Sequence, residues 1–390
     1  MFSRRASWPL HVNRLHQIAS ARRAAGTLID LTVSNPTDCG FAYPGDEIIA
    51  ALGNAAALQY RPSPAGLAAA REAVSAYYAA RALAIAPDRI LLTASTSEAY
   101  SHLFRLLCDA GDDVLMPAPT YPLFEMLAGL HDVRLAACPM FYSGGWHLDF
   151  DALLCVASPR TRAVLLVHPN NPTGSYIKPE EWLTLRQHAR ERNWALVVDE
   201  VFYDYAIAPA TAVPLALDDG PLIFLLNGFS KIVALPQMKL GWVSVHGEDA
   251  ARQDAFARLE VINDLYLSVD APIQHAAARI LARRHGIQDQ IRARLQANLD
   301  QLDRALAPCS ALERLAVEGG WSAVVRLPSV HSDEEWAELL LNRAGVLTHP
   351  GHFYEFQSGS FLVLSLLQPT GIFRQGVDKL IAEAMLELNL

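Results

Sequence analysis

The sequence predicts an α/β fold of two domains joined by helices, and three observations support this. Short apolar runs alternate with longer helical patterns from about residue 65 to residue 245. These runs are apolar along their whole length, which is typical of strands in a mostly parallel sheet with helices on both faces. A long helical stretch follows, and the remaining residues alternate short strands and helices again. We therefore expect a large sheet domain, a helical connection and a smaller α/β unit.

Local patterns predict each element in the order of the chain. Arg14–Ala25 is a predicted helix that runs into a strand at Leu28–Val33. Runs rich in Val, Ile and Leu predict the strands of the large sheet, which are Ile90–Thr93, Asp113–Met116, Ala163–His168, Ala195–Asp199, Leu222–Asn227 and Gly241–Val245. The helices expected between them are Gly66–Ala84, Ser97–Asp109, Leu123–Gly129 and Pro179–Glu191. The later stretch Ala250–Leu306 has Glu, Arg and Gln on its polar face, which indicates surface helices.

The composition excludes several classes of protein. The 390 residues are 52% hydrophobic and 19% charged, so the chain can bury a large core and is not disordered. The net charge of −9, with scattered basic residues, argues against nucleic acid or an anionic membrane surface as a partner. The apolar runs are strand-sized, so we expect no membrane span. The five cysteines are far apart and form no CxxC, which predicts a cytoplasmic protein without a disulfide framework or metal site.

The N-terminus has a composition of its own. Residues 1–29 contain five arginines and no acidic residue, as organelle transit segments do. Because Arg14–Ala25 runs directly into a predicted strand, we favour a basic helix of the mature fold.

Polar residues follow the predicted strands at the sheet edge where open parallel sheets bind their ligands. Ser95, Thr96 and Ser97 come directly after Ile90–Thr93 and open a helical pattern. Their hydroxyls suit a phosphate group, together with the free N–H groups and the dipole of a helix N-terminus. An ordinary Ser or Thr helix cap is the alternative.

Other strand ends present an amide, a carboxylate, an amine and an aromatic ring. Asn171 lies in a loop with two prolines, and Tyr121 is a ring held between two prolines that either stacks on a ligand or packs in the core. Asp199 either faces a positive partner or caps a helix. Lys231 is either a surface residue or, in apolar surroundings, an uncharged nucleophile able to form a Schiff base. With the phosphate cradle, these groups are what pyridoxal 5'-phosphate requires.

The chain resembles the fold-type-I pyridoxal-phosphate enzymes of the class I/II aminotransferase family from about Leu28 to Gly376. The most specific motifs are Asn170-Asn171-Pro172-Thr173-Gly174, Asp199-Glu200 and Ser230-Lys231 followed by Leu240-Gly241-Trp242. The resemblance implies a large domain with a mostly parallel, seven-stranded-type sheet flanked by helices, and a smaller α/β domain formed by the N- and C-terminal segments. The corresponding boundaries are 1–40 for the N-terminal segment, 41–285 for the cofactor-binding domain, and 286–390 for the interdomain helix and the C-terminal small domain.

The same resemblance implies a role for each matching residue. Lys231 resembles the lysine that forms the internal aldimine and moves the proton between the substrate Cα and the cofactor. Asp199 resembles the acid that keeps the pyridine nitrogen protonated, Asn171 the donor to the phenolic oxygen, and Tyr121 the ring that stacks on the pyridine. The other implied cofactor-binding residues are Ser95, Thr96, Ser97, Tyr203, Ser230 and Lys239, and also Tyr60, which would reach the phosphate of a neighbouring subunit. A homodimer with shared active sites follows, in which segments near Val33–Thr37 and His349–Phe353 line the substrate entrance.

The sequence departs from the family pattern at four positions. Gly228 replaces a serine three residues before the lysine, and Lys239 replaces an arginine that pairs with the phosphate. Phe202 stands where many relatives have a tyrosine on the phenolic oxygen, with Tyr203 next to it. Val363 stands where relatives have an arginine that binds the substrate α-carboxylate.

The missing arginine leaves the substrate open, because a buried carboxylate without a cation is destabilised by roughly several kcal/mol. Either the substrate presents a different group there or another cation takes over. The alternative cations are Arg61, Lys239, His349, His352 and Arg374.

The resemblance implies an aminotransferase that moves an amino group between an amino acid and a 2-oxo acid through Lys231, by ping-pong kinetics and without a metal. A lyase on the same fold, such as a carbon–sulfur β-lyase or an enzyme similar to aminocyclopropane-carboxylate synthases, is the alternative. A silent effector-binding module of a transcription regulator is disfavoured, because the lysine is present and no basic helix-turn-helix precedes the domain. A dehydrogenase is disfavoured because no GxGxxG follows the early strands.

Overall fold

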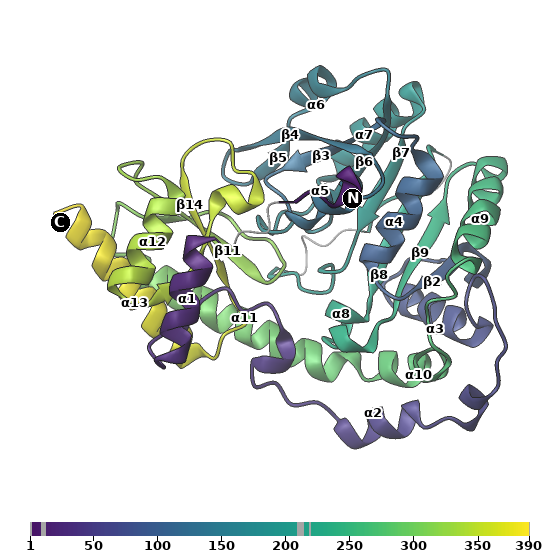
Figure 1. Cartoon of the computed structure of the whole chain (residues 1–390), viewed down its shortest axis with the longest axis horizontal. Coiled ribbons are helices and arrows are strands. Elements are labelled where there is room, and N and C mark those ends of the chain that lie inside the picture. Colours follow the sequence, from purple (N-terminus) through teal and green to yellow (C-terminus); the bar gives the residue numbers. More distant parts are fainter. Residues whose placement is uncertain (1, 9–12, 209–213, 218–219, 390) are drawn as a thin grey trace.

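The computed structural model describes residues 2–8, 13–208, 214–217 and 220–389. It shows a large α/β part and a smaller one side by side, with α11 (Arg284–Leu306) running along both (Figure 1). The fold class predicted from the sequence is confirmed. None of the described helices combines the length and the apolarity needed to cross a bilayer.

The large part is built on a sheet of eight strands in the order β2-β9-β8-β7-β6-β3-β4-β5. The strands are β2 Ile90–Thr93, β3 Asp113–Ala118, β4 Arg134–Tyr142, β5 Trp146–Leu148, β6 Thr161–Val167, β7 Ala195–Asp199, β8 Ile223–Gly228 and β9 Gly241–His246. The neighbours from β8 to β4 are parallel, whereas β9 is antiparallel to both β2 and β8. The short β5 forms a hairpin with β4 and extends the expected seven-stranded arrangement by one strand.

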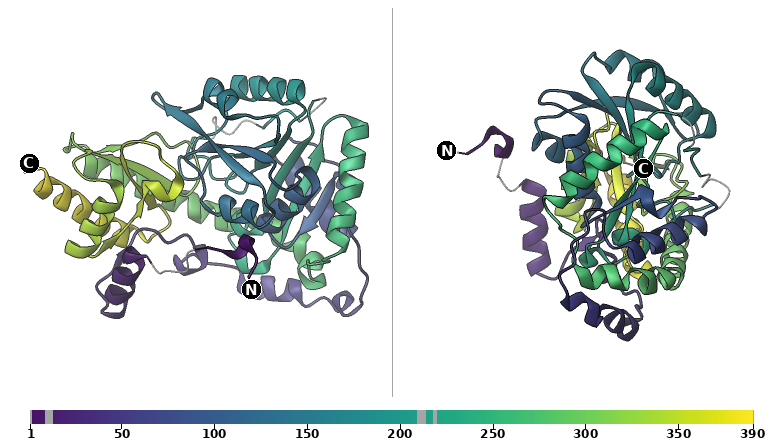
Figure 2. Two further views of the ribbon diagram at one scale, coloured as in Figure 1. Left: turned by 45° about the horizontal axis from the view of Figure 1, so that its top comes forward. Right: turned by 90° about the vertical axis from the view of Figure 1, so that its right-hand side faces the viewer.

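Helices cover both faces of this sheet, which explains why its central strands are apolar at every position. On one face, α3 (Ala68–Ala79), α7 (Pro179–Arg192) and α10 (Ala271–Ala282) share a buried core with alternate residues of the strands. On the other face, α4 (Thr96–Leu107), α5 (Leu123–Gly129) and α9 (Asp249–Asp264) bury the remaining strand residues. Figure 2 shows the sheet between these two layers.

The smaller part combines both ends of the chain. Its sheet has the order β10-β11-β14-β13, with strands Glu313–Arg314, Ser322–Leu327, Ser360–Ser365 and His349–Pro350 in that order. The helices beside it are α12 (Asp333–Arg343) and α13 (Thr370–Glu387). The predicted N-terminal strand is reduced to β1 (Ile29–Asp30), which pairs in parallel with β12 (Val346–Leu347), and α1 (Arg14–Ala24) contacts α12.

Short elements complete the connections. The remaining α-helices are α2 Gly45–Leu52, α6 Phe150–Val156 and α8 Phe229–Ile232. The 3-10 turns are Arg4–Ala6, Pro36–Asp38, Ala55–Leu58, Pro87–Arg89, Pro236–Met238 and Gly351–Tyr354. The long helical stretch of the sequence is three helices, α9, α10 and α11, separated by short turns.

Candidate active site

A cavity of about 480 Å³ lies between the two parts of the molecule, at the carboxyl ends of the large sheet's parallel strands. Lys231, Asp199 and Tyr121 all line it. So do four of the other residues predicted to bind the cofactor, namely Thr96, Ser97, Asn171 and Ser230. The small part contributes walls from β11, β13 and β14, and the N-terminal segment contributes Thr32 and Ser34. The structure therefore brings most of the predicted site into one space.

Asp199 ends β7 and is 4% exposed. Its Oδ2 accepts a hydrogen bond from the Tyr100 hydroxyl at 2.6 Å, and its Oδ1 accepts one from the Val201 N–H at 2.9 Å. Burial raises the pKa of Asp199 to about 6, while these two donors and Lys231 oppose the rise. Tyr100 could not be recognised as a site residue from the sequence, because it occupies an apolar position of α4 and its pattern is that of a core residue.

Lys231 lies on α8, directly after β8. Its Nζ lies 4.6 Å from the ring centroid of Trp321 and 5.3 Å from that of Phe202. Burial lowers the pKa of Lys231 to about 8, and the charge of Asp199 acts in the opposite direction. At pH 7 roughly a tenth of such an amine is uncharged, far more than of an ordinary lysine, and the uncharged form is the nucleophile. Trp321 is a second residue that the sequence analysis did not find, because it comes from a distant loop.

The N-terminus of α4 forms the turn expected to hold a phosphate. Ser95 is its N-cap and accepts a hydrogen bond from the Glu98 N–H at 3.2 Å, so its side chain is used within the turn and does not line the cavity. Gly241 packs behind this turn, where a Cβ would lie 2.9 Å from the Ser95 carbonyl carbon. A different close approach explains Gly228, because a Cβ there would lie 2.9 Å from the Leu240 carbonyl oxygen.

Two loops at the sheet edge are tied together by Asn170. Its Nδ2 donates to the Pro119 carbonyl at 2.8 Å and to the Thr173 Oγ1 at 2.9 Å. This leaves the adjacent Asn171 on the cavity wall, where Tyr121, 40% exposed, is also found. The loop sequence with two asparagines is therefore used both for structure and for lining the site.

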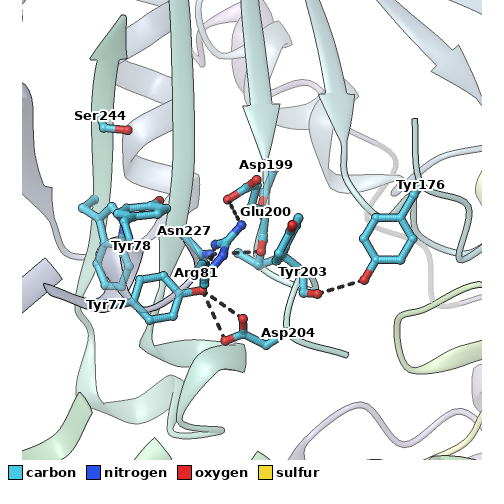
Figure 3. Close-up of polar contacts among 12 residues, drawn as sticks. Tyr77, Tyr78, Arg81, Tyr176, Asp199, Glu200, Tyr203, Asp204, Asn227 and Ser244 are labelled. Atoms are coloured by element: carbon cyan, nitrogen blue, oxygen red, sulfur yellow. Dashed lines mark hydrogen bonds and ion pairs between the residues drawn. The ribbon is translucent and has the colours of Figure 1, made fainter. Parts of the chain in front are cut away.

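Tyr203 does not lie where it was expected. Phe202 lines the cavity, whereas Tyr203 turns to the other side of the chain, where the Arg81 guanidinium lies 3.5 Å from its ring centroid (Figure 3). Burial raises the pKa of Tyr203. The reason for the difference is the tight turn after β7, in which consecutive side chains point in different directions.

A buried polar cluster holds the chain directly after Asp199. Arg81 and Glu200 form an ion pair of 2.8 Å, with Glu200 1% exposed. The Asn227 amide donates to the Glu200 carbonyl at 3.0 Å, and the Tyr77 hydroxyl contacts the Asp204 carboxylate (Figure 3). These contacts fix the turn from which Asp199 enters the cavity.

Besides Ser95 and Tyr203, two further predicted residues, Lys239 and Tyr60, lie outside the cavity. Lys239 is exposed, with a φ of 49°, and does not line it. Tyr60 is 84% exposed and lines a second cavity of about 470 Å³ together with Arg61. Within one chain, the structure does not bring either residue to Lys231.

The family model described as "Aminotransferase class I and II" matches residues 28–366 of this chain. The chain belongs to this family. This class I and II aminotransferase is 28% identical to the glutamate-pyruvate aminotransferase AlaA of Escherichia coli strain K12 over 68% of the chain and 66% of that protein. It is 24% identical to AlaA of Haemophilus influenzae, over 90% of the chain and 89% of that protein.

Solved structures share the fold over the full length of this aminotransferase. An alanine aminotransferase from Pyrococcus furiosus superposes with a TM-score of 0.89 at 21% identity, covering 100% of both chains. An aspartate aminotransferase mutant from Thermus thermophilus superposes with a TM-score of 0.85 at 21% identity, covering 98% of this chain and 99% of that one. The reported relatives are named as transferases, and the lyase alternative is therefore not favoured.

Proposed function

We propose that this chain is a pyridoxal-phosphate-dependent transaminase that moves an amino group between an amino acid and a 2-oxo acid in two half-reactions at one site. The observation that carries the proposal is that Lys231 and Asp199 line the same cavity. Burial raises the pKa of the Asp199 carboxyl and lowers the pKa of the Lys231 amine, so both groups are shifted toward their uncharged forms. When bound, the cofactor supplies an electron sink for negative charge at the substrate Cα.

The donor set of the cavity fits this cofactor. Lys231 offers an amine for its aldehyde, Asp199 an acid for its ring nitrogen, and the N-terminus of α4 free N–H groups for its phosphate. Asn171 offers an amide to the phenolic oxygen. The aromatic side chains of Phe202, Trp321, Tyr121 and Phe124 line the space and offer it apolar surface.

Each residue then has a task in the reaction. Lys231, with a pKa near 8, accepts and returns the proton at the substrate Cα, because a base of that strength is suited to both steps. Asp199 keeps the proton on the ring nitrogen, and the Tyr100 hydroxyl orients the Asp199 carboxylate.

A homodimer with shared active sites is part of the proposal. Tyr60, 84% exposed, and Leu58, 89% exposed, flank the second cavity and offer apolar surface to a second copy of the chain. We propose small-molecule amino acids and 2-oxo acids as the only other partners, with neither nucleic acid nor membrane. A cytoplasmic location is supported by the five cysteines, all of which are free.

The test is the spectrum of the purified protein and its half-reaction. We expect a yellow protein in which borohydride fixes the cofactor covalently to Lys231. The names of the relatives make L-alanine and L-glutamate the first donors to add, and each should give its 2-oxo acid in stoichiometric amount with the pyridoxamine form. Release of pyruvate and ammonia beyond one equivalent, without an acceptor, would show elimination and contradict the proposal.

A further inference from the structure

The substrate end of the cavity has few groups that can hold an anion. Among its described lining residues, Lys231 and His349 are the only two side chains that can carry a positive charge. Lys231 has its own task at the cofactor. Val363, at the position of the family's arginine, offers only an aliphatic side chain to the cavity.

The structure decides between the other cations named by the sequence analysis. Arg374 is exposed on α13, and Lys239 is exposed outside the cavity. Arg61 lines the second cavity. His352 does not line the active-site cavity either, and its Nδ1 lies 3.1 Å from the Asp333 carboxylate. Within the described part of one chain, His349 is therefore the remaining candidate.

His349 stands directly across from the arginine position. In the antiparallel pair of β13 and β14, His349 is the register partner of Val363. Residues that are directly opposite in such a pair place their side chains on the same face of the sheet, about 4.5–5.5 Å apart at Cβ. Both side chains line the cavity, so the imidazole occupies the neighbourhood that Val363 leaves without a charge.

The ring of His349 is held by one of its two nitrogens. Nδ1 lies 2.9 Å from the Tyr354 hydroxyl. The Tyr354 carbonyl in turn accepts a hydrogen bond from the Thr120 N–H at 2.8 Å, which ties this turn to the loop of Tyr121. Nε2 has no hydrogen-bond partner among the described residues, so it is the nitrogen that remains for a ligand.

We propose that His349 binds the α-carboxylate of the amino acid substrate through Nε2, and that the imidazole takes up a proton when the carboxylate arrives. This inference rests on the proposed function, because it assigns the substrate end of the same site. It makes His349 a binding and specificity residue that replaces a guanidinium with a group of variable charge.

The electrostatics of the empty pocket agree with this assignment. Burial lowers the pKa of His349, so the free enzyme holds a neutral imidazole there, and Asp30 of β1 opposes the shift. Asp30 is itself paired with Arg23 at 2.8 Å. The other titratable groups that line the cavity are Tyr100, Tyr121, Tyr354, Lys231 and Asp199. A carboxylate next to the imidazole raises the pKa of His349 again, and the substrate therefore binds with a proton.

The first measurement is the half-reaction with the preferred amino acid donor, followed by the cofactor spectrum. His349→Gln is expected to raise KM for that donor about thirty-fold or more, as a buried charge pair that loses one partner does, with a smaller change in kcat. The double variant H349Q/V363R is expected to recover most of this loss. Arg374→Gln, which removes an exposed cation outside the cavity, serves as the matched control and leaves KM unchanged.

The second measurement is binding without turnover. Propionate is titrated into the cofactor-loaded enzyme by calorimetry in two buffers of different ionisation enthalpy. Near pH 8 we expect uptake of close to one proton in the wild type and none in H349Q. If H349Q is poorly folded, Tyr354→Phe keeps the imidazole, frees its Nδ1, and should weaken propionate binding several-fold.

These results separate the inference from the proposed function. A wild type that forms the pyridoxamine form, but whose KM and propionate binding do not change in H349Q, overturns the role of His349 alone. A wild type that accepts an amine without a carboxylate, such as ethylamine in place of L-alanine, as readily as the amino acid also overturns it. A protein that transfers no amino group from any donor overturns the proposed function instead.

Discussion

The two ends of the active-site cavity are built in different ways. The end that we propose for the cofactor, called the cofactor end below, takes Lys231, Asp199 and the N-terminus of α4 from strand ends of one sheet. The substrate end takes its walls from segments far apart in the chain, from Thr32 to Val363. The ionisable groups of the cofactor end are held by the large sheet, whereas those of the substrate end depend on the small part. Changes at the first end should therefore affect every substrate, and changes at the second should affect the choice of substrate.

The largest effect is expected for Lys231→Ala, because it removes both the covalent attachment and the base. We expect a colourless protein and a loss of at least about 10⁴-fold in the half-reaction for all donors. Single-turnover spectroscopy with several amino acids checks this. Lys379→Ala, an exposed lysine on α13, should behave as the wild type. A colourless K231A protein that still turns over substrate would contradict the role of Lys231, and with it the distinction between the two ends of the cavity.

The next effect is expected for Asp199→Ala. The variant should retain the cofactor through Lys231 and the α4 turn, yet lose about 10²- to 10⁴-fold in Cα–H cleavage, since an unprotonated ring is a poor electron sink. The measurement is the rate with an amino acid deuterated at Cα, which shows whether this step has become limiting. Unchanged rates would contradict the role of Asp199.

The same contrast explains what the sequence could predict. Asp199, Lys231, Asn171 and Thr96 are local motifs that follow buried strands, and parallel strands bring their carboxyl ends to one edge, so the cofactor end follows from pattern alone. Trp321 and Tyr100 are buried aromatic residues, and their sequence context is that of the core. Only the tertiary contact shows that they face the site. His349 was one of five open alternatives, and the pairing with Val363 is what distinguishes it.

The misplacement of Tyr203 shows the limit of reasoning from neighbouring positions. Phe202 and Tyr203 are adjacent in the sequence, and Tyr203 was predicted to bind the cofactor because it has a hydroxyl group. In the structure, the turn after β7 directs the Tyr203 ring away from the cavity, where it lies against the guanidinium of Arg81, the ion-pair partner of Glu200. A buried ion pair is stable only when both charges have their partners, and nothing in the sequence around Arg81, which follows α3, indicated the pair.

A third prediction concerns the stability of the cofactor-free protein. The pKa of Asp199 is about 6 in the folded state against 3.8 ordinarily, so the folded state binds this proton more tightly than the unfolded chain. The contribution of Asp199 to the free energy of unfolding therefore falls as the pH rises from about 4 to 6, by roughly 3 kcal/mol. Asp199→Asn removes this loss.

Urea unfolding across that pH range checks the prediction. The D199N variant should have a larger free energy of unfolding than the wild type above pH 6, and this difference should vanish toward pH 4. An advantage that is the same at every pH would mean that the amide improves packing and that the carboxylate is not destabilised by burial. The buried, destabilised carboxylate of Asp199 would then no longer distinguish the cofactor end from the substrate end.

The smallest effect is expected for Tyr100→Phe, and it sharpens the comparison most. The variant loses the hydroxyl that donates to Asp199 at 2.6 Å, and with it about 10- to 150-fold in rate, because a hydrogen bond to a charged group contributes roughly 1.5–3 kcal/mol. Loss of this donor leaves the effect of burial less opposed, so the pKa of Asp199 rises and the acid limb of the pH–rate profile should move to higher pH.

Tyr78→Phe is the control, since Tyr78 is also buried but its hydroxyl accepts from the Trp242 indole. It should lower stability without moving the profile. A Y100F profile identical to that of the wild type would show that Tyr100 only packs, and that the orientation of Asp199 depends on the Val201 N–H and the turn held by Arg81 and Glu200.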